Sequence, residues 1–144
     1  MWKLREFQDL GHQLVIIIGD YTAQIGDPSD KLSKRPFLTK KQIDENLKNY
    51  KQQIGKIIDL GSVEWHYNSE WLAELTPREL DDLAELFSVQ QMLARRNFKD
   101  RFEKGEEISL REMHYPLYQG YDSVMIKADV EIGGSDQLFN MLAG

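Results

Sequence analysis

The continuous apolar run from Leu14 to Ile18 constrains the fold more than any other stretch of the sequence. Five consecutive aliphatic residues followed by Gly19 are typical of a strand that is buried on both faces, as strands of a parallel sheet are. At this length a buried core helix is the poorer interpretation. We therefore expect an α/β fold whose sheet contains residues 14–18.

A polar stretch, GDYTAQIGDPSDKLSKRP at residues 19–36, follows this run. It combines turn-forming residues and charges without helical or strand periodicity, which predicts a loop. The loop leaves the carboxyl end of the expected strand, and ligands of open α/β sheets bind at that edge. It is therefore the first candidate for ligand binding.

Capping residues and apolar spacing predict the other elements. One helix should end at Gly11, and four more should begin after Thr39, Thr76, Ser109 and Ser135, the first of them running to about Ile58. Two further strands are expected at Val63–Tyr67 and at residues 130–132. The second of these precedes Gly133 and Gly134 and a helix start, an arrangement that suits an anion or a ribose.

Composition narrows the class of protein. The chain has 144 residues, a formal net charge of −6, three histidines and no cysteine. One domain is expected, without disulfides, a zinc site or nonspecific nucleic-acid binding through the whole surface. No apolar run of eighteen or more residues and no export leader is present, so we expect no membrane association and a cytoplasmic protein.

The stretch HYPLYQGYDS, residues 114–123, places Tyr115, Gln119 and Asp122 on one face of the helix that follows Ser109. Pro116 should kink this helix, because proline lacks the donor for the backbone carbonyl four residues before it. Two interpretations stay open on spacing alone. The face either meets water, or it forms a pocket that hydrogen-bonds a small zwitterion with a polar tip.

Three motifs in order, IGDPSDKLSKR, YPLYQGYDS and GGSDQLFN, resemble those of bacterial tyrosyl-tRNA synthetases, which are class I aminoacyl-tRNA synthetases. The resemblance implies a Rossmann-like catalytic domain, incomplete here, with a helical connective insertion that forms a homodimer interface. The implied division is a first Rossmann part at 1–37, the insertion at 38–110, and the start of the second Rossmann part at 111–144.

The resemblance also implies an activity. Such a ligase activates L-tyrosine with ATP, with Mg²⁺ accompanying the nucleotide, and transfers the tyrosyl group to tRNA(Tyr). No metal held by the protein itself is implied. We expect this chain alone to be inactive, because it lacks the His-Ile-Gly-His type ATP signature and the Lys-Met-Ser-Lys-Ser loop of the family. The alternative is a non-catalytic dimerisation or binding module that uses the same fold.

Family roles transfer to matching positions of this sequence. The substrate amino group is expected at Asp27, Tyr115 and Gln119, the phenol at Asp122, and the substrate carboxylate near Gln137. Nucleotide contacts are expected from Thr22, Gly134 and Asp136, and catalytic cations from Lys31 and Arg35. A supporting role is expected for Asn68.

Two features near these motifs bear on the transfer. Asp30 stands where the family usually has glycine, which places an acid beside Lys31. Arg95, Arg96, Lys99 and Arg101 could form a patch toward the tRNA acceptor arm, although charges that alternate with acids favour a solvated helix face.

Overall fold

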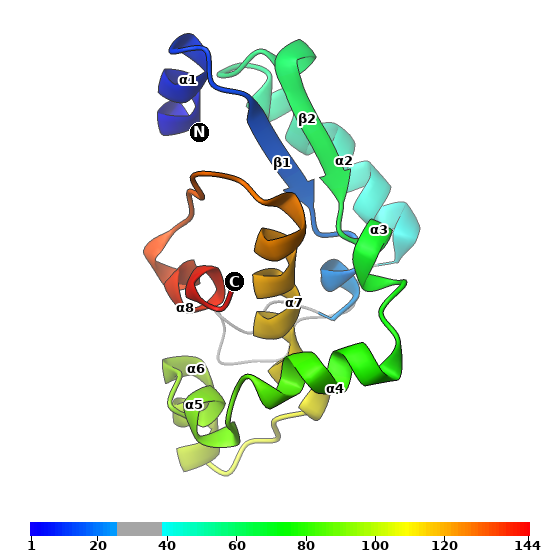
Figure 1. Ribbon diagram of the computed structural model, residues 1–144, viewed down its shortest axis with the longest axis vertical. Helices are drawn as coiled ribbons and strands as arrows, with labels where there is room; N and C mark the ends of the chain where they lie inside the picture. The colour runs from blue at the N-terminus through cyan, green and yellow to red at the C-terminus, as the bar shows by residue number, and fades with distance from the viewer. Residues whose placement is uncertain (26–38) are drawn as a thin grey trace.

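The computed structural model describes residues 1–25 and 39–144. Its first half contains α1 (Trp2–Asp9), β1 (Leu14–Ile18), the 3-10 helix η1 (Thr22–Gln24), α2 (Lys40–Ile54), η2 (Leu60–Ser62) and β2 (Val63–Tyr67). The second half contains α3 (Ser69–Leu72), α4 (Pro77–Glu85), α5 (Val89–Leu93), α6 (Arg96–Glu103), α7 (Leu110–Ile126), η3 (Ser135–Gln137) and α8 (Leu138–Leu142). Figure 1 shows the strands and α1 at one end, and α4 to α6 at the other.

The two strands are parallel and paired over their whole length, from Leu14 opposite Val63 to Ile18 opposite Tyr67. Both predicted strands at these positions are therefore confirmed. The strands leave the sheet at the same level, so the residues that follow them lie next to each other. This edge carries the candidate site.

Two hydrophobic cores lie on either side of β1. The first joins β1 and β2 to the end of α2 and to α1 through Leu14, Ile54, Ile58 and Val63. The second joins α3, α7 and η1, with Trp71, Leu72, Tyr118 and Ile25 as its buried members. Ile16 packs on the first core and Ile17 on the second, because successive strand residues point to opposite faces.

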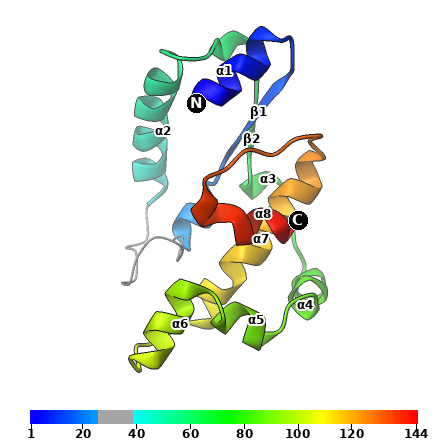
Figure 2. The same cartoon turned by 90° about the vertical axis from the view of Figure 1, so that its left-hand side faces the viewer.

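The division at residue 38 stays a prediction. Figure 2 shows α2 running alongside the strands, away from α4 to α6. The end of α2 and β2, from Ile54 to Trp65, pack with β1 in one core.

Capping boxes begin α2, α4 and α7 as predicted, at Thr39, Thr76 and Ser109. A further capping box at Ser88 begins α5. Each capping box involves only neighbouring residues. The hydroxyl of the first residue accepts from a backbone N–H three residues later, and the amide or carboxyl side chain of that later residue accepts from the backbone N–H of the first. Helix α2 ends at Ile54, and residues up to Ile58 continue as turns.

Two expectations in the last part of the chain were wrong. Residues 130–132 form no strand, and Val130 and Ile132 are exposed, because no described strand lies beside them to complete a ladder. Ser135 does not cap a helix with its side chain; it begins the 3-10 turn η3 after Gly134, and α8 starts at Leu138.

Helix α7 continues through buried Pro116 to Ile126 and ends at Lys127, whose φ of 53° is left-handed. Helix α8 lies against it at Gly120. A Cβ at this glycine would come within 2.8 Å of the carbonyl carbon of Ala143. The absence of a side chain at residue 120 therefore permits the close approach of the two helices.

Candidate active site

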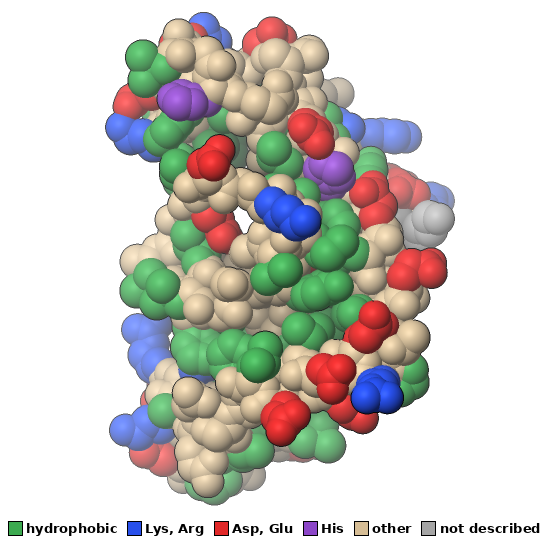
Figure 3. All heavy atoms as spheres, viewed as in Figure 1, with side chains coloured by type: hydrophobic (Ala, Val, Ile, Leu, Met, Phe, Trp, Pro, Cys, Tyr) green, Lys and Arg blue, Asp and Glu red, His purple; other side chains and the backbone are tan. Residues whose placement is uncertain are grey.

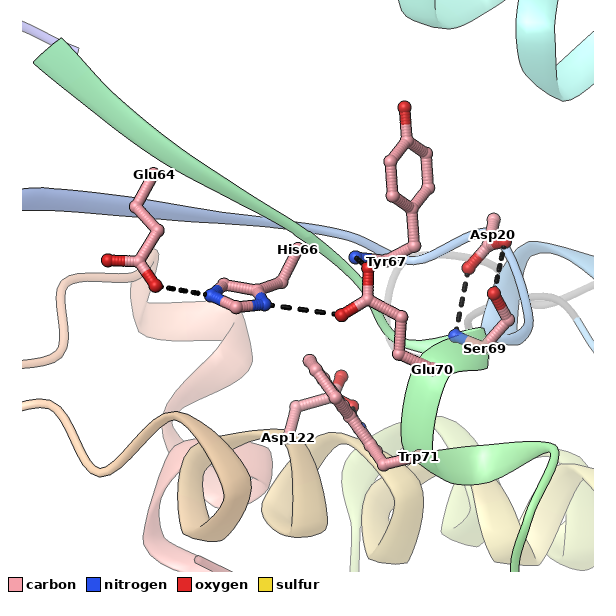
Figure 4. Close-up of polar contacts among 8 residues, drawn as sticks. All are labelled: Asp20, Glu64, His66, Tyr67, Ser69, Glu70, Trp71 and Asp122. Atoms are coloured by element: carbon pink, nitrogen blue, oxygen red, sulfur yellow. Dashed lines mark hydrogen bonds and ion pairs between the residues drawn. The ribbon is translucent and has the colours of Figure 1, made fainter.

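Asp20 joins the end of β1 to the start of α3. Its carboxylate accepts hydrogen bonds from the Ser69 backbone N–H at 3.0 Å and the Ser69 hydroxyl at 2.7 Å (Figure 4). The same carboxylate accepts from the Tyr21 N–H at 3.0 Å. An acid at this place satisfies free N–H groups at the beginning of α3. The two strand ends are thereby tied together.

Asn68, which follows β2, is fully buried and contacts both neighbouring segments. Its Oδ1 accepts from the Tyr21 N–H at 3.0 Å, and its Nδ2 donates to the Thr22 hydroxyl at 3.0 Å. The same Nδ2 donates to Asp122 Oδ2 at 3.2 Å. Asn68 therefore connects the segments that follow β1 and β2 to α7, and its supporting role in a ligand pocket stays a prediction.

Asp122 lies on α7 with 8% of its surface exposed, so it is not a helix-end acid in water. Its Oδ1 accepts a 2.7 Å hydrogen bond from the Trp71 indole, and its Oδ2 accepts from Asn68. Burial raises the pKa of Asp122 to about 6, although the two donors act in the opposite direction. At neutral pH the group is a buried carboxylate with two neutral donors.

A cavity of about 760 Å³ brings together most of the predicted tyrosine-binding residues. Tyr115, Gln119 and Asp122 line it from α7, Thr22 from η1, and Gln137 from η3. Figure 3 shows an opening in the surface between the upper part of the molecule and the part around α7 and α8. The polar face predicted for residues 115–122 thus lines a cavity, and the ligand roles of its residues stay predictions.

Asn140, on α8, links the two glutamines of this cavity. Its Nδ2 donates to Gln119 Oε1 at 2.9 Å and to Gln137 Oε1 at 2.8 Å. Its Oδ1 accepts from the Arg95 guanidinium at 2.9 Å. Asn140 is fully buried.

A second cavity of about 700 Å³ lies between the α5–α6 region and η3, where Arg95, Arg96, Ser135 and Asp136 contribute to its wall. Asp136 is exposed there and accepts from Gln137 Nε2 at 2.8 Å. Gly134 approaches the same side chain, since a Cβ at residue 134 would lie 2.4 Å from Asp136 Oδ1. The predicted nucleotide residues Gly134 and Asp136 are thus next to the first cavity and do not line it.

His66 lies near Trp71 and between two carboxylates, those of Glu64 and Glu70 (Figure 4). Its Nε2 is 2.7 Å from Glu64 Oε1, and its Nδ1 is 3.2 Å from Glu70 Oε2. The hydrogen bond to Glu64, followed by that to Glu70, raises the pKa of His66. Glu70 also accepts from the Tyr67 N–H at 3.1 Å, which steadies the turn before Trp71.

Three predicted residues, Asp27, Lys31 and Arg35, lie outside the described residues, as does Asp30. Of the four cations considered for a tRNA patch, Arg101 is buried and paired with Glu112, so it belongs neither to such a patch nor to a solvated face. Within residues 1–25 and 39–144, no group of three or more His, Asp or Glu side chains could hold a metal ion. In the same residues no helix is long and apolar enough to cross a membrane.

Sequence reasoning missed Asp20, Trp71 and Asn140. Asp20 follows a strand directly, and that position was a usable indication. Trp71 bonds a residue 51 positions away, and Asn140 bonds Gln119 and Arg95, 21 and 45 positions away, so the sequence around them does not show these contacts.

Comparison with known proteins agrees with this geometry. The sequence matches the family of tRNA synthetases class I (W and Y) over residues 1–144. It is 51% identical to the tyrosine–tRNA ligase of Carboxydothermus hydrogenoformans and 52% identical to that of Thermotoga maritima, each over 142 residues and 99% of this chain. These alignments cover 34% and 35% of the two relatives, so the chain spans about a third of their length.

The fold is similar to solved structures of the same kind. The C-terminally truncated mitochondrial tyrosyl-tRNA synthetase of Aspergillus nidulans superposes with a TM-score of 0.77 at 26% identity, over 97% of this chain and 44% of that one. The corresponding protein of Coccidioides posadasii gives a TM-score of 0.71 at 27% identity, over 93% and 40%. The α/β class I synthetase fold expected from the motifs is confirmed, and the chain belongs to the W and Y family of class I tRNA synthetases.

Proposed function

We propose that this chain carries the tyrosine-binding part of a tyrosine–tRNA ligase, which activates L-tyrosine with ATP to tyrosyl-adenylate and transfers it to tRNA(Tyr). The observation that carries the proposal is the buried carboxylate of Asp122, which Trp71 and Asn68 orient at a cavity lined by Tyr115 and Gln119. Identity of about half the residues to two tyrosine–tRNA ligases supports it.

Asp122 is suited to recognise a phenol. Above a pH of about 6 it is ionised and accepts hydrogen bonds only, so a phenolic O–H can donate to it. Hydrogen bonds to charged groups contribute roughly 1.5 to 3 kcal/mol. A phenylalanine ring would offer this carboxylate no donor beyond Trp71 and Asn68 and would bind more weakly.

Tyr115 and Gln119 are suited to the other end of the substrate. Seven residues of helix separate Tyr115 from Asp122, which corresponds to roughly 10 Å along the axis. That is the length scale of an amino acid with one aromatic ring. The phenol would then lie at Asp122, the ammonium at Tyr115 and Gln119, and the carboxylate near Gln137.

The nucleotide is expected on the side of Gly134 and Asp136, next to the first cavity. Mg²⁺ would arrive with the ATP phosphates, because no described cluster of acids and histidines is suited to hold it. Roles for Asp27, Lys31 and Arg35 in binding the ammonium and stabilising the reacting phosphate rest on the resemblance of IGDPSDKLSKR alone.

Calorimetric titration of the 144-residue chain with L-tyrosine, tyramine and L-phenylalanine tests the proposal. We expect tyrosine and tyramine to bind more tightly than phenylalanine, and Asp122→Asn to remove most of this difference. Asp81→Asn, which removes an exposed carboxylate on α4, is the matched control and should leave binding unchanged. Equal affinities of the parent and Asp122→Asn for tyrosine would contradict the assignment.

Tyrosine-dependent ATP–pyrophosphate exchange tests the chemical step separately. We expect this chain alone to show none, since the His-Ile-Gly-His type signature and the Lys-Met-Ser-Lys-Ser loop of the family are not found in these 144 residues. Exchange above the background of a Lys31→Ala variant would contradict that expectation.

A homodimer is the partner that we propose for the chain itself. Val89, at the start of α5, and Phe102, on α6, have 59% and 64% of their surface exposed, and both lie in the insertion that the resemblance implies as a dimer interface. The same exposed side chains favour the second candidate function, a dimerisation module without catalysis. Tyrosine binding distinguishes the two, because a pure dimerisation module has no use for a phenol-reading carboxylate.

A further inference from the structure

Asn140, on α8, contacts both glutamines that are predicted to bind the amino acid: Gln119 on α7 and Gln137 on η3. We infer that Asn140 is a positioning residue that sets the orientation of the Gln119 and Gln137 amides, and thereby decides whether each offers a donor or an acceptor to the cavity. The identity of the ligand rests on the proposed function. The orientation of the Gln119 and Gln137 amides rests on their hydrogen bonds to Asn140.

The geometry leaves one arrangement for the two glutamines. An asparagine nitrogen carries two hydrogens, and Nδ2 lies 2.9 Å from Gln119 Oε1 and 2.8 Å from Gln137 Oε1. Each glutamine therefore turns its oxygen toward Asn140 and its amino group away. Gln137 supplies an independent check, because its Nε2 donates to Asp136 Oδ2 at 2.8 Å.

Arg95 determines which way Asn140 itself points. A guanidinium only donates hydrogen bonds and stays protonated, so the atom of Asn140 that faces it must be the oxygen. The contact from Arg95 Nη2 to Asn140 Oδ1 is 2.9 Å. The guanidinium also lies over the Phe139 ring, 4.6 Å from its centroid, and 5.5 Å from that of Phe98. Arg95 thus fixes the orientation of the Asn140 amide, and Asn140 in turn fixes the orientation of the two glutamine amides.

This polarity matters for an amino-acid ligand. A carbonyl oxygen has two lone pairs, so Gln119 Oε1 can accept from Asn140 and from an ammonium group at the same time. A reversed Gln119 amide would direct N–H groups toward the ammonium, which has only donors. Asn140 would therefore select ligands with an ammonium group without touching them.

The first test needs no ligand. Asn140→Asp keeps the shape of the side chain but cannot donate when ionised, so Gln119 and Gln137 should turn their amino groups toward residue 140. We expect the side-chain amide ¹H–¹⁵N resonances of both glutamines to shift in the labelled 144-residue chain. Asn46→Asp, which makes the same change at an exposed position on α2, should leave both resonances in place.

Asn140→Leu is a second variant for the same measurement, to be used if a buried aspartate at residue 140 prevents folding. It adds no charge and removes the donor to both Oε1 atoms, so the same two resonances should shift as the glutamine amides lose their fixed orientation. Unchanged Gln119 and Gln137 resonances in whichever variant folds would overturn the inference.

The second test measures selectivity with Asn140→Leu. L-tyrosine is compared with 3-(4-hydroxyphenyl)propionate, which has the phenol and the carboxylate but no ammonium. We expect the parent to bind tyrosine more tightly than the propionate, and the ratio of the two affinities to be about tenfold smaller in the variant. A purely structural effect would lower the affinity for both ligands equally. If the parent binds neither ligand, the proposed function fails, while the amide resonances still decide the role of Asn140.

Discussion

Asp122 combines a buried carboxylate with donors that carry no charge, and this combination makes its ionisation costly. Its folded pKa of about 6 lies above the ordinary 3.8, so the folded chain binds this proton more tightly than the unfolded chain. The resulting stabilisation is complete below the unfolded pKa and is lost as the pH rises through about 6.

We therefore predict that the free energy of unfolding of the parent, relative to Asp122→Asn, falls between pH 4 and pH 7. A shift of this size corresponds to a fall on the order of 3 kcal/mol. Urea unfolding of both proteins at the two pH values measures it, and other titrating groups cancel in the difference. A difference that does not vary with pH would show that Asp122 titrates normally.

His66, unlike Asp122, is partly exposed and lies beside two groups of opposite charge, Glu64 and Glu70. Its folded pKa is raised, mainly by the hydrogen bonds to Glu64 and then Glu70. The stabilisation is therefore present below the ordinary value of 6.5 and is lost as the pH rises through the folded pKa. The pair Glu64 and Glu70 holds the imidazolium next to Trp71, whose ring centroid is 6.1 Å from that of His66.

We predict that Glu64→Gln and Glu70→Gln each lower the pKa of His66, measured from its ring resonances in a pH titration. Only Glu70→Gln should also shift the Trp71 indole N–H resonance, because Glu70 alone bonds the Tyr67 backbone. Equal effects of the two variants on the indole would mean that Glu70 does not steady this turn.

At the scale of elements, a buried ion pair fastens α6 to the start of α7. Arg101 and Glu112 are 4% and 7% exposed, and the guanidinium also donates to the Glu107 carbonyl. Burial by itself raises the pKa of Glu112, but Arg101 and the Ser109 cap outweigh burial and lower it. This contribution to stability is present above the ordinary pKa of 4.5 and is lost as the pH falls below it.

We predict that Arg101→Met destabilises the chain by about 3 to 5 kcal/mol, because it leaves a buried carboxylate without its partner. The double variant Arg101→Met, Glu112→Met should be less destabilised than the single one, since no charge stays buried. Thermal unfolding of the parent and the variants measures both effects. A double variant less stable than Arg101→Met would count against the desolvation argument.

The contact between α7 and α8 depends on Gly120. In an exposed helix, Gly→Ala is stabilising by roughly 0.5 to 1 kcal/mol. Here the added Cβ would meet backbone atoms of Ala143 at 2.8 and 3.0 Å, so α8 must move. We predict that Gly120→Ala speeds amide hydrogen exchange in α8 more than in β1. Equal protection of α8 in the parent and the variant would contradict this.

The sequence predicted those elements whose cause is local. Thr39, Thr76 and Ser109 cap their helices with residues three positions away, and Leu14–Ile18 is apolar throughout, so both signals can be read within a few residues of the sequence. Residues 130–132 have a strand-like composition, but a strand needs a neighbour. Arg101 looked like a surface cation because its partner, Glu112, is on the next helix.

In the candidate site, too, the residues carried by one helix could be predicted, whereas most of their partners from other elements could not. Helical spacing placed Tyr115, Gln119 and Asp122 at one cavity, since one helix carries all three. Their polar partners, Trp71, Asn68 and Asn140, come from other elements. The resemblance suggested Asn68, whereas no pattern in the sequence indicated the other two.

At the scale of the whole molecule, apolar side chains remain on the surface at both ends. Trp2 on α1 is 72% exposed, and Val89 and Phe102 are similarly exposed at the opposite end (Figure 1). Met92 and Phe98, which belong to the same 38–110 insertion, are buried within the chain. Any interface at this end must therefore use the residues outside that internal core.

We predict that the chain self-associates and that Val89→Glu with Phe102→Glu shifts it toward the monomer in sedimentation equilibrium. Trp2→Glu places the same charge on an equally exposed apolar residue at the other end and should leave the association unchanged. A monomeric parent at high concentration would remove the dimer proposal.

The pairing of Ile18 with Tyr67 has a consequence for how this chain tolerates change in length. Asp20 reaches Ser69, and Asn68 reaches Tyr21, because both strands end at one level. Inserting or deleting one residue in either strand would exchange its two faces and also displace one member of the site relative to the other. Viable length variants should therefore carry their insertions in the connections, such as the turn between α6 and α7, and leave both five-residue strands intact.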